Sequence, residues 1–378
     1  MIAESAPAAP YALLAELTHR CPLRCPYCSN PEELIRRSGE LDTAQWKKVL
    51  NDAAEAGVLQ VHFSGGEPTA RHDIEELVGY ADSLGLYTNL ITSGVLTDSQ
   101  QLARLAQQGL AHVQLSIQDV EDDIGDWVAG YEGAQQKKRQ LAQQIDECGL
   151  ALTVNAVIHR HNIDRVCEMI DLAVSMRAQR VEVANVQYYG WGIRNRKNLM
   201  PTIDQTRKMH DQVVAKIKEM EGIIVIDYVV PDYYARKPKA CMNGWARQFV
   251  NVSPEGKVLP CHAAETMTDL VFENIKDKSL SEIWRHSEAF NRYRGTEWMR
   301  EPCRSCDRRE IDWGGCRCQA LALTGDASNA DPVCELAPGH AEVVALALSD
   351  SGESDVDATN GFTQSVEFDY RGFSKRPS

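Results

Sequence analysis

The sequence predicts an α/β fold in which a parallel sheet is covered by helices and followed by a cysteine-rich segment. Short β-branched runs alternate with amphipathic stretches through the first half of the 378 residues, and this alternation is typical of parallel strands joined by right-handed crossovers. Beyond residue 240 the periodicity fades, and seven of the twelve cysteines lie there. Six strand–helix units are compatible with an open barrel or a doubly wound sheet, and the pattern does not distinguish between them.

Six strands and five helices are predicted in the first half of the chain. The strands are expected at Ala12–Glu16, Leu59–Phe63, Tyr87–Ile91, His112–Ile117, Leu152–Val157 and Arg180–Ala184, and the helices at residues 42–56, 72–84, 98–108, 133–148 and 163–176. Asp42 and Asp98 precede helical patterns as N-cap residues. Glycines stand where helices commonly end in a left-handed conformation, at Gly57, Gly85, Gly109 and Gly149.

The second half is divided by its change in composition. One helix is expected at residues 203–220 and one strand at 223–230. We therefore predict a sheet core at 1–195, a connecting segment at 196–240, a cysteine-rich domain at 241–348 and an acidic tail at 349–378. The cysteine-rich domain is expected to be held by metal rather than by a core. The tail is expected to be mobile because it is polar and acidic.

Composition and charge narrow the possible functions. Hydrophobic residues make up 43% and charged residues 25% of the chain, which is ordinary for a soluble globular protein. A net charge of −14 argues against nonspecific binding to nucleic acid. Residues 1–10 carry no secretory signal pattern, and no apolar run is long enough to span a membrane, so we expect a cytoplasmic protein. In a reducing compartment, twelve cysteines indicate metal ligands or catalytic groups rather than disulfides.

Cys21, Cys25 and Cys28 follow the first predicted strand with the spacing C-x3-C-x2-C. Closely spaced thiolates of this kind can hold an iron–sulfur cluster. Three cysteines leave the fourth iron of a cubane open, as a catalytic zinc site leaves one coordination position open. Chance would give a cysteine two such neighbours roughly once in a thousand cases. A zinc knuckle remains the alternative.

This cysteine spacing, with an aromatic residue, Tyr27, before its last cysteine, resembles the radical S-adenosylmethionine (radical SAM) superfamily. The resemblance implies a partial (βα)6 TIM-like barrel and a 4Fe–4S cluster whose open iron binds the amino and carboxylate groups of SAM. It also implies that the reduced cluster cleaves SAM to methionine and a 5′-deoxyadenosyl radical, which takes hydrogen from a substrate.

Further SAM contacts are implied at the ends of later strands. Gly65, Gly66, Glu67 and Pro68 match the superfamily's GGEP element, which lines the methionyl amino group. Two glycines let the backbone approach a ligand closely, although a Gly-Gly pair alone is usually just a turn. The resemblance also points to strand-end residues that contact the ribose and carboxylate, namely Thr92, Ser93, Ser116 and Asn155. Barrel enzymes place their chemistry at these carboxyl ends, but for each polar residue alone an ordinary loop role is as plausible.

The second set of cysteines resembles the SPASM extension of peptide-modifying radical SAM enzymes. The pattern runs from Cys241 through Gly256, and its remaining cysteines are Cys261, Cys303, Cys306, Cys316 and Cys334. It departs from the family twice, because Asp312 stands where the family has a cysteine and Cys318 is extra. An ordinary surface carboxylate is the alternative role for Asp312.

The family's interleaved arrangement implies two auxiliary clusters, each 4Fe–4S or 2Fe–2S. It assigns Cys241, Cys261 and Cys316 to the first cluster, with Cys318 as the fourth ligand. It assigns Cys303, Cys306 and Cys334 to the second cluster, with Asp312 as the fourth ligand. A carboxylate is a harder ligand than a thiolate, so the second cluster is expected to differ in potential from an all-cysteine one.

Longer runs resemble the PqqE family of radical SAM enzymes, which act in pyrroloquinoline quinone (PQQ) biosynthesis. The runs are Cys21–Pro31, Cys303–Glu310, Asp312–Ala320, Leu323–Ala327 and Asp331–Cys334. The resemblance implies formation of a carbon–carbon bond between a glutamate and a tyrosine side chain of a precursor peptide, PqqA. It further implies a peptide chaperone, PqqD, and an external electron donor, and no role for nucleic acid or a membrane.

Three alternatives remain. Another SPASM enzyme, sulfatase-maturating or thioether-forming, is disfavoured by Asp312 and Cys318, since those families keep the usual cysteine spacing. A noncatalytic iron–sulfur electron carrier would need neither an open-iron cluster nor the Gly65–Pro68 element. A zinc-stapled binding module would be excluded by iron and acid-labile sulfide.

Overall fold

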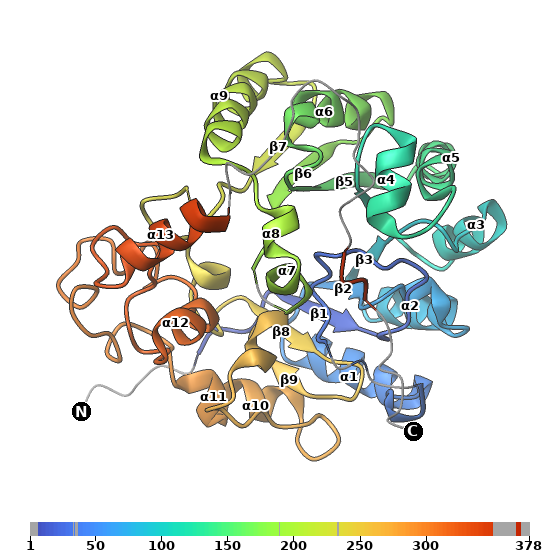
Figure 1. Cartoon of the computed structure of the whole chain (residues 1–378). Coiled ribbons are helices and arrows are strands. Elements are labelled where there is room, and N and C mark those ends of the chain that lie inside the picture. The colour runs from blue at the N-terminus through green and yellow to red at the C-terminus, as the bar shows by residue number, and fades with distance from the viewer. Residues whose placement is uncertain are drawn as a thin grey trace, which may run out of the picture.

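Nine strands form one sheet, and its carboxyl edge carries the loops of the candidate site. The computed structural model describes residues 7–32, 34, 37–188, 190–232, 234–350 and 368–371. The strands lie in the order β7-β6-β5-β4-β3-β2-β1-β8-β9 (Figure 1). All neighbouring strands are parallel except β8 and β9. Because β7 and β9 do not pair with each other, the barrel is partial and open, as the radical SAM resemblance implied.

The strands expected from the sequence are present. Their bounds are Ala12–Glu16 (β1), Gln60–Ser64 (β2), Tyr87–Thr92 (β3), His112–Ile117 (β4), Ala151–Ile158 (β5), Arg180–Asn185 (β6) and Val225–Tyr228 (β7). The predictions differ by one or two residues at most ends, as strand boundaries read from patterns commonly do. Two strands, Phe249–Val252 (β8) and Val258–Leu259 (β9), were not predicted.

Helices connect the strands and cover the outside of the barrel. The main helices are Thr43–Glu55 (α1), Ile74–Ser83 (α2), Ser99–Gln107 (α3), Asp122–Ala129 (α4), Ala134–Glu147 (α5), Val166–Ser175 (α6) and Ile203–Glu219 (α9). The others are Gly190–Arg194 (α7), Arg196–Leu199 (α8), Leu280–His286 (α10), Glu288–Asn291 (α11), Arg317–Thr324 (α12) and His340–Asp350 (α13). Among the described residues, no helix is long and apolar enough to cross a membrane.

The predicted helix signals are confirmed. Asp42 forms a capping box with Gln45, in which each side chain accepts a hydrogen bond from the other residue's backbone. Asp98 accepts from the backbone of Gln101. The four predicted terminal glycines all have positive φ angles between 68° and 95°. Side-chain caps satisfy backbone donors that the first turn of a helix leaves free.

Side chains alternate between the two faces of the strands. In β2, Val61 and Phe63 are fully buried in the core, whereas His62, between them, hydrogen-bonds Asn89 of β3. Successive residues of a strand point to opposite faces. One face of the sheet therefore packs in the main core, and the other carries polar side chains.

The cysteine-rich part shares the main core, which differs from the prediction that metal alone would hold it. β8 extends the sheet by pairing with β1, and α10 contacts α1. Trp245, Ile283 and Trp284 are buried in the same hydrophobic cluster as the barrel strands. The four-part division of the chain remains a prediction.

Most of the predicted acidic tail, at residues 351–367 and 372–378, lies outside the described residues. Within it, residues 368–371 are described, and Phe368 and Arg371 are buried. This short segment differs from the expected mobile tail because it is packed against the barrel.

Candidate active site

The loop that follows β1 carries the first three candidate ligands. Burial raises the pKa of the Cys21 thiol to about 12 and that of the Cys25 thiol to about 11. Cys28 closes a turn, because its backbone N–H donates to the Cys25 carbonyl at 3.1 Å. Thiols with raised pKa values remain protonated at neutral pH unless a positive centre such as iron takes the place of the proton. The loop therefore suits metal ligation better than free thiol chemistry.

Gly65 and Gly66 hold this loop from the neighbouring strand end. The Gly66 N–H donates to Thr18 O at 2.5 Å, and the Glu67 N–H donates to Arg20 O at 2.7 Å. A Cβ atom on Gly66 would lie 2.3 Å from Arg20 O, and one on Gly65 would lie 2.4 Å from Thr18 O. Only glycine allows this approach of two backbones. The glycines thus fix the approach of the chain to Cys21.

The Glu67 side chain is fully buried and ties its own turn to the end of β3. Its carboxylate accepts hydrogen bonds from the backbone and hydroxyl of Thr69, at 3.1 and 2.7 Å. It also accepts from the Thr92 hydroxyl at 2.8 Å and from the backbone and hydroxyl of Ser93, at 2.7 and 2.5 Å. A carboxylate with this many donors has its acceptor capacity largely filled. The structure therefore gives Glu67 a positioning role and brings Ser93 to the site beside it, while Pro68 begins a short helical turn at Pro68–Ala70.

Ser116 and Asn155 are register partners on β4 and β5. The Asn155 amide donates to the Glu182 carboxylate at 2.7 Å, and burial raises the pKa of Glu182. Asn155 therefore holds a neighbouring carboxylate inside the barrel. Tyr27, the other predicted cofactor contact, packs its ring 5.6 Å from that of His159.

Lys138 is a site residue that the sequence reasoning missed. It is 0% exposed, and its ammonium donates to the side-chain oxygen of Gln118. The Gln118 amide faces the Cys25 sulfur at 3.9 Å. Burial lowers the pKa of Lys138 to about 8, while the nearby Cys25 and Cys21 raise it. A signal was present in the sequence, because Lys138 lies on the buried face of α5 with Ala134 and Leu141.

A partly buried ion pair holds the loop after β4. Arg165 donates from Nε to Asp119 Oδ1 at 2.8 Å and from a second nitrogen to Oδ2 at 2.5 Å. The Asn162 amide donates to the backbone oxygen of Gln118 at 2.9 Å. Paired hydrogen bonds between a guanidinium and a carboxylate fix geometry as well as adding energy. The Arg165–Asp119 pair and Asn162 together position Gln118, which contacts Lys138.

Four cysteines predicted to share one auxiliary cluster lie together. Cys241 contacts Cys261 and Cys316, and Cys318 contacts the same two residues. The contact with Cys261 raises the pKa of Cys241 to about 12. Among the described residues, no three His, Cys, Asp or Glu side chains converge closely enough to hold a single metal ion. The four thiols thus form a ring in which each contacts two others, and a multi-iron cluster would take them at separate corners.

Arg317 fixes the chain between two of these cysteines. It is 1% exposed and donates to the carbonyls of Ala327 and Asn329, each at 2.7 Å. Its guanidinium also lies over the Trp298 ring, 4.8 Å from the centroid. These contacts anchor the start of α12, which carries Cys318.

The second predicted ligand set also lies together. Cys303, Cys306, Asp312 and Cys334 line one small pocket. Asp312 is only 8% exposed, so an ordinary surface carboxylate is the wrong description of it. It accepts from the Gly314 N–H at 3.1 Å and pairs with Arg308 at 3.3 Å. Asp331 lies between the two cysteine sets, because it accepts from the backbone of Cys316 at 2.6 Å and also lines this pocket.

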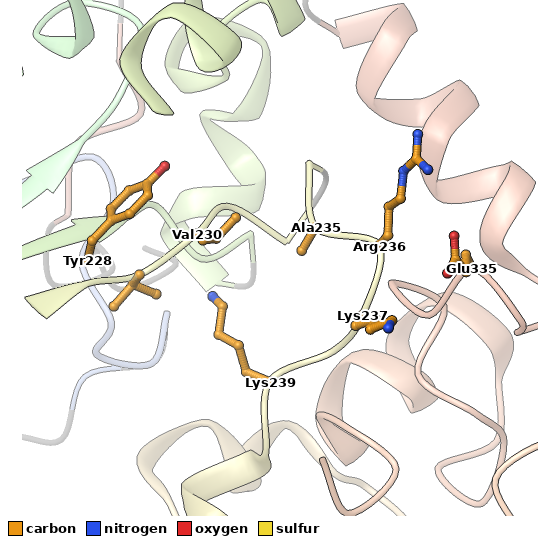
Figure 2. A pocket seen from close by; sticks show the side chains of 8 residues that line it. Tyr228, Val230, Ala235, Arg236, Lys237, Lys239 and Glu335 are labelled. Atoms are coloured by element: carbon orange, nitrogen blue, oxygen red, sulfur yellow. The ribbon is translucent and has the colours of Figure 1, made fainter. Parts of the chain in front are cut away.

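A larger pocket, of about 650 Å³, lies at the carboxyl end of β7. Figure 2 shows Arg236, Lys237 and Lys239 on the chain that leaves the strand, with Glu335 beside Lys237. Lys239 forms an ion pair with Asp232 at 3.0 Å. Three cations give this pocket a positive lining on a chain whose net charge is −14.

Two family models match the chain. "Radical SAM superfamily" matches residues 15–173, and "Iron-sulfur cluster-binding domain" (SPASM) matches residues 241–307. A protein named PqqA peptide cyclase from Methylocella silvestris is 60% identical over 338 residues, covering 89% of this chain and 91% of that protein. Proteins of the same name from Bradyrhizobium diazoefficiens and Rhodopseudomonas palustris are 59% and 55% identical, over 88% and 97% of this chain and 87% and 94% of theirs.

Solved structures confirm the fold. Streptococcus suis SuiB bound to S-adenosylmethionine superposes with a TM-score of 0.73 at 21% identity, covering 87% of this chain and 78% of that one. SuiB bound to its precursor peptide SuiA gives a TM-score of 0.72 at 20% identity, over 88% and 77% of the two chains. At this identity the likeness concerns architecture.

Proposed function

The chain belongs to the family of the PqqA peptide cyclases, which are radical SAM proteins with a SPASM domain, and from this membership we propose its reaction. It joins a glutamate side-chain carbon to a tyrosine ring within the precursor peptide PqqA, as a step in PQQ biosynthesis. The observation that carries the proposal is the partly buried cysteine loop at the carboxyl end of β1, braced by Gly65 and Gly66. The relatives' shared name favours this reaction over another SPASM chemistry.

The residues present fit a SAM-binding cluster. Cys21, Cys25 and Cys28 would hold three irons of a 4Fe–4S cluster, which with SAM would supply a hydrogen-abstracting radical. Lys138 provides a buried cation near the thiols. We propose that its ammonium would balance the negative charge of the cluster and of the SAM carboxylate. Glu67 keeps Ser93 and the GGEP backbone in place for the methionyl group. Tyr27, Ser116 and Asn155 are proposed to line the remainder of the SAM site.

The auxiliary clusters would accept the electron that the tyrosine ring must lose after the new bond forms. Abstraction takes one hydrogen atom from glutamate, and bond formation leaves the tyrosine ring with one proton and one electron to lose. We assign Cys241, Cys261, Cys316 and Cys318 to one auxiliary cluster and Cys303, Cys306, Cys334 and Asp312 to the other. An external donor would supply the electron that starts the cycle.

Asp312 offers a direct test of the second ligand set. We expect Asp312→Ala to lower the iron content and change the spectrum of one auxiliary cluster, because a buried ligand position is lost. Asp312→Cys is expected to keep the iron and shift the reduction potential, since thiolate is a softer ligand. Glu310→Ala, a change to an exposed carboxylate in the same loop, is the control. Unchanged iron and an unchanged spectrum in Asp312→Ala would remove Asp312 from the ligand set.

The proposed partners are the precursor peptide, its chaperone PqqD and a reductant, all in the cytoplasm, where thiols stay reduced. We propose that residues 1–195 form the barrel core and residues 241–348 the auxiliary-cluster domain, joined by residues 196–240.

The mass of the precursor peptide tests the reaction itself. The reconstituted protein is incubated without oxygen with SAM, a reductant, the peptide and PqqD. We expect the peptide to lose two hydrogens, with the new link mapped to one glutamate and one tyrosine. If 5′-deoxyadenosine forms while the peptide mass stays unchanged, the radical chemistry stands and the proposed substrate is wrong.

A further inference from the structure

The segment Phe368–Arg371 lies across the mouth of the barrel. Figure 1 shows it in dark red between α4 and α7, although these two helices lie far earlier in the sequence. Phe368 is 7% exposed and Arg371 is 5% exposed. Two of these four residues are therefore packed into the protein, while Asp369 between them stays exposed.

Asn195 clamps the backbone of this segment. Its amide nitrogen donates to Asp369 O at 2.9 Å, and its amide oxygen accepts from the Asp369 N–H at 2.8 Å. The same side chain donates to Pro26 O in the cysteine loop at 2.9 Å, which fixes its orientation. Two hydrogen bonds to one residue's backbone recognise an extended peptide whatever its side chain at that position.

Two aromatic side chains of the segment occupy the same wall of the groove. The Phe368 ring lies 4.5 Å from that of Trp127 and 5.8 Å from that of His161. The Tyr370 hydroxyl donates to Trp127 O at 3.1 Å. Its ring faces Gly130, where an added Cβ would lie 3.5 Å away. Asp369, between them, is exposed, so the side chains alternate as in an extended strand.

Arg371 carries the segment to the cysteine loop. Its guanidinium donates to the backbone oxygen of His19, two residues before Cys21. The groove therefore leads directly to the proposed radical site.

We infer that this groove is a peptide-binding subsite of the active site and that the chain's own Phe368–Arg371 occupies it in competition with the precursor peptide. The inference rests on the proposed function for the identity of the competing peptide. The subsite takes an extended segment that has two aromatic side chains one residue apart, followed directly by a basic residue. A tail that fills the groove for about 80% of the time weakens the apparent affinity of a competing peptide about fivefold.

The double variant Phe368→Ala/Tyr370→Ala in the full chain tests the competition. It removes both aromatic contacts, so we expect the dissociation constant for the precursor peptide to fall about fivefold or more, measured by calorimetry. Tyr87→Ala, which removes a half-exposed tyrosine at the opposite end of β3, should leave that constant unchanged. Equal or weaker affinity in the double variant would overturn the competition.

A synthetic peptide with the sequence of residues 365–373 tests the groove without the precursor. It should bind the double variant in trans, and a version with alanine at both aromatic positions should not. Failure of the unmodified synthetic peptide to bind overturns the subsite. If it binds while the precursor peptide is neither bound nor modified, the groove stands and the proposed substrate is wrong.

Discussion

Cys28→Ala is expected to abolish cleavage of SAM while the auxiliary clusters persist. Cys28 is proposed as one of three ligands of the SAM-binding cluster, and it lies on a loop apart from the two C-terminal cysteine sets. Removing one of only three thiolates leaves a second iron without a protein ligand, so we expect the cluster to be lost. The measurement is 5′-deoxyadenosine formation, with a fall of about a thousandfold or more, alongside iron content and the visible spectrum.

Cys148→Ala is the matched control for this variant. Cys148 caps the end of α5 and packs against the main core, outside all three proposed ligand sets. It should keep its full iron content and SAM cleavage. Continued 5′-deoxyadenosine formation by Cys28→Ala would contradict the assignment of the first cluster, and loss of the auxiliary spectrum as well would show that the three sets are not independent.

The barrel strands were predictable because each is a local pattern. A buried strand in a parallel sheet appears as a short β-branched run, and six such runs are present. β8 was missed because it has only four residues, and what defines it is pairing between Phe249 and Ala12, far apart in the sequence. Its neighbour β9 has only two residues. Pattern reasoning has no access to such long-range pairing.

The grouping of the cysteines was predictable because cysteine spacing is also local, but the contacts of other predicted site residues were not. Glu67 was expected to face SAM, and the structure shows its carboxylate holding Thr69, Thr92 and Ser93. Which groups a buried carboxylate meets depends on where neighbouring strands end. In contrast, the position of Lys138 could have been recognised from the sequence, because it lies on the apolar face of an amphipathic helix. A lysine in such a position must be paired with a polar partner or have a function.

The composition of the tail as a whole conceals a short segment of different character near its end. Residues 349–355 are acidic and small, but residues 368–376 contain aromatic and basic side chains. Phe368 and Arg371 are buried although the tail as a whole was expected to be mobile. Residues 368–376 alone therefore differ in character from the tail as a whole.

Lys138→Met should weaken SAM binding strongly without unfolding the protein. A buried ammonium needs negative charge nearby, and among the described residues Asp126 and Glu67 raise the pKa of Lys138 from a distance without forming an ion pair with it. The cluster and the SAM carboxylate would supply that charge. Loss of a charged hydrogen bond of about 2–3 kcal/mol corresponds to a roughly 30- to 160-fold higher dissociation constant for SAM. Equilibrium dialysis and the change in the cluster's electron paramagnetic resonance spectrum on adding SAM measure this directly.

Because methionine replaces a buried charge with an apolar chain of similar length, the folded state should keep or gain stability. A purely structural role for Lys138 therefore predicts the opposite pattern, with a lower melting temperature and normal SAM affinity. Lys137→Met changes the neighbouring exposed lysine, which bonds to Tyr131 and Val95, and should leave SAM binding intact. Lys138→Arg keeps the charge but enlarges the group in a fully buried position, so we expect only partial recovery of affinity. Normal SAM affinity in Lys138→Met would return Lys138 to the role of a core residue satisfied by Gln118.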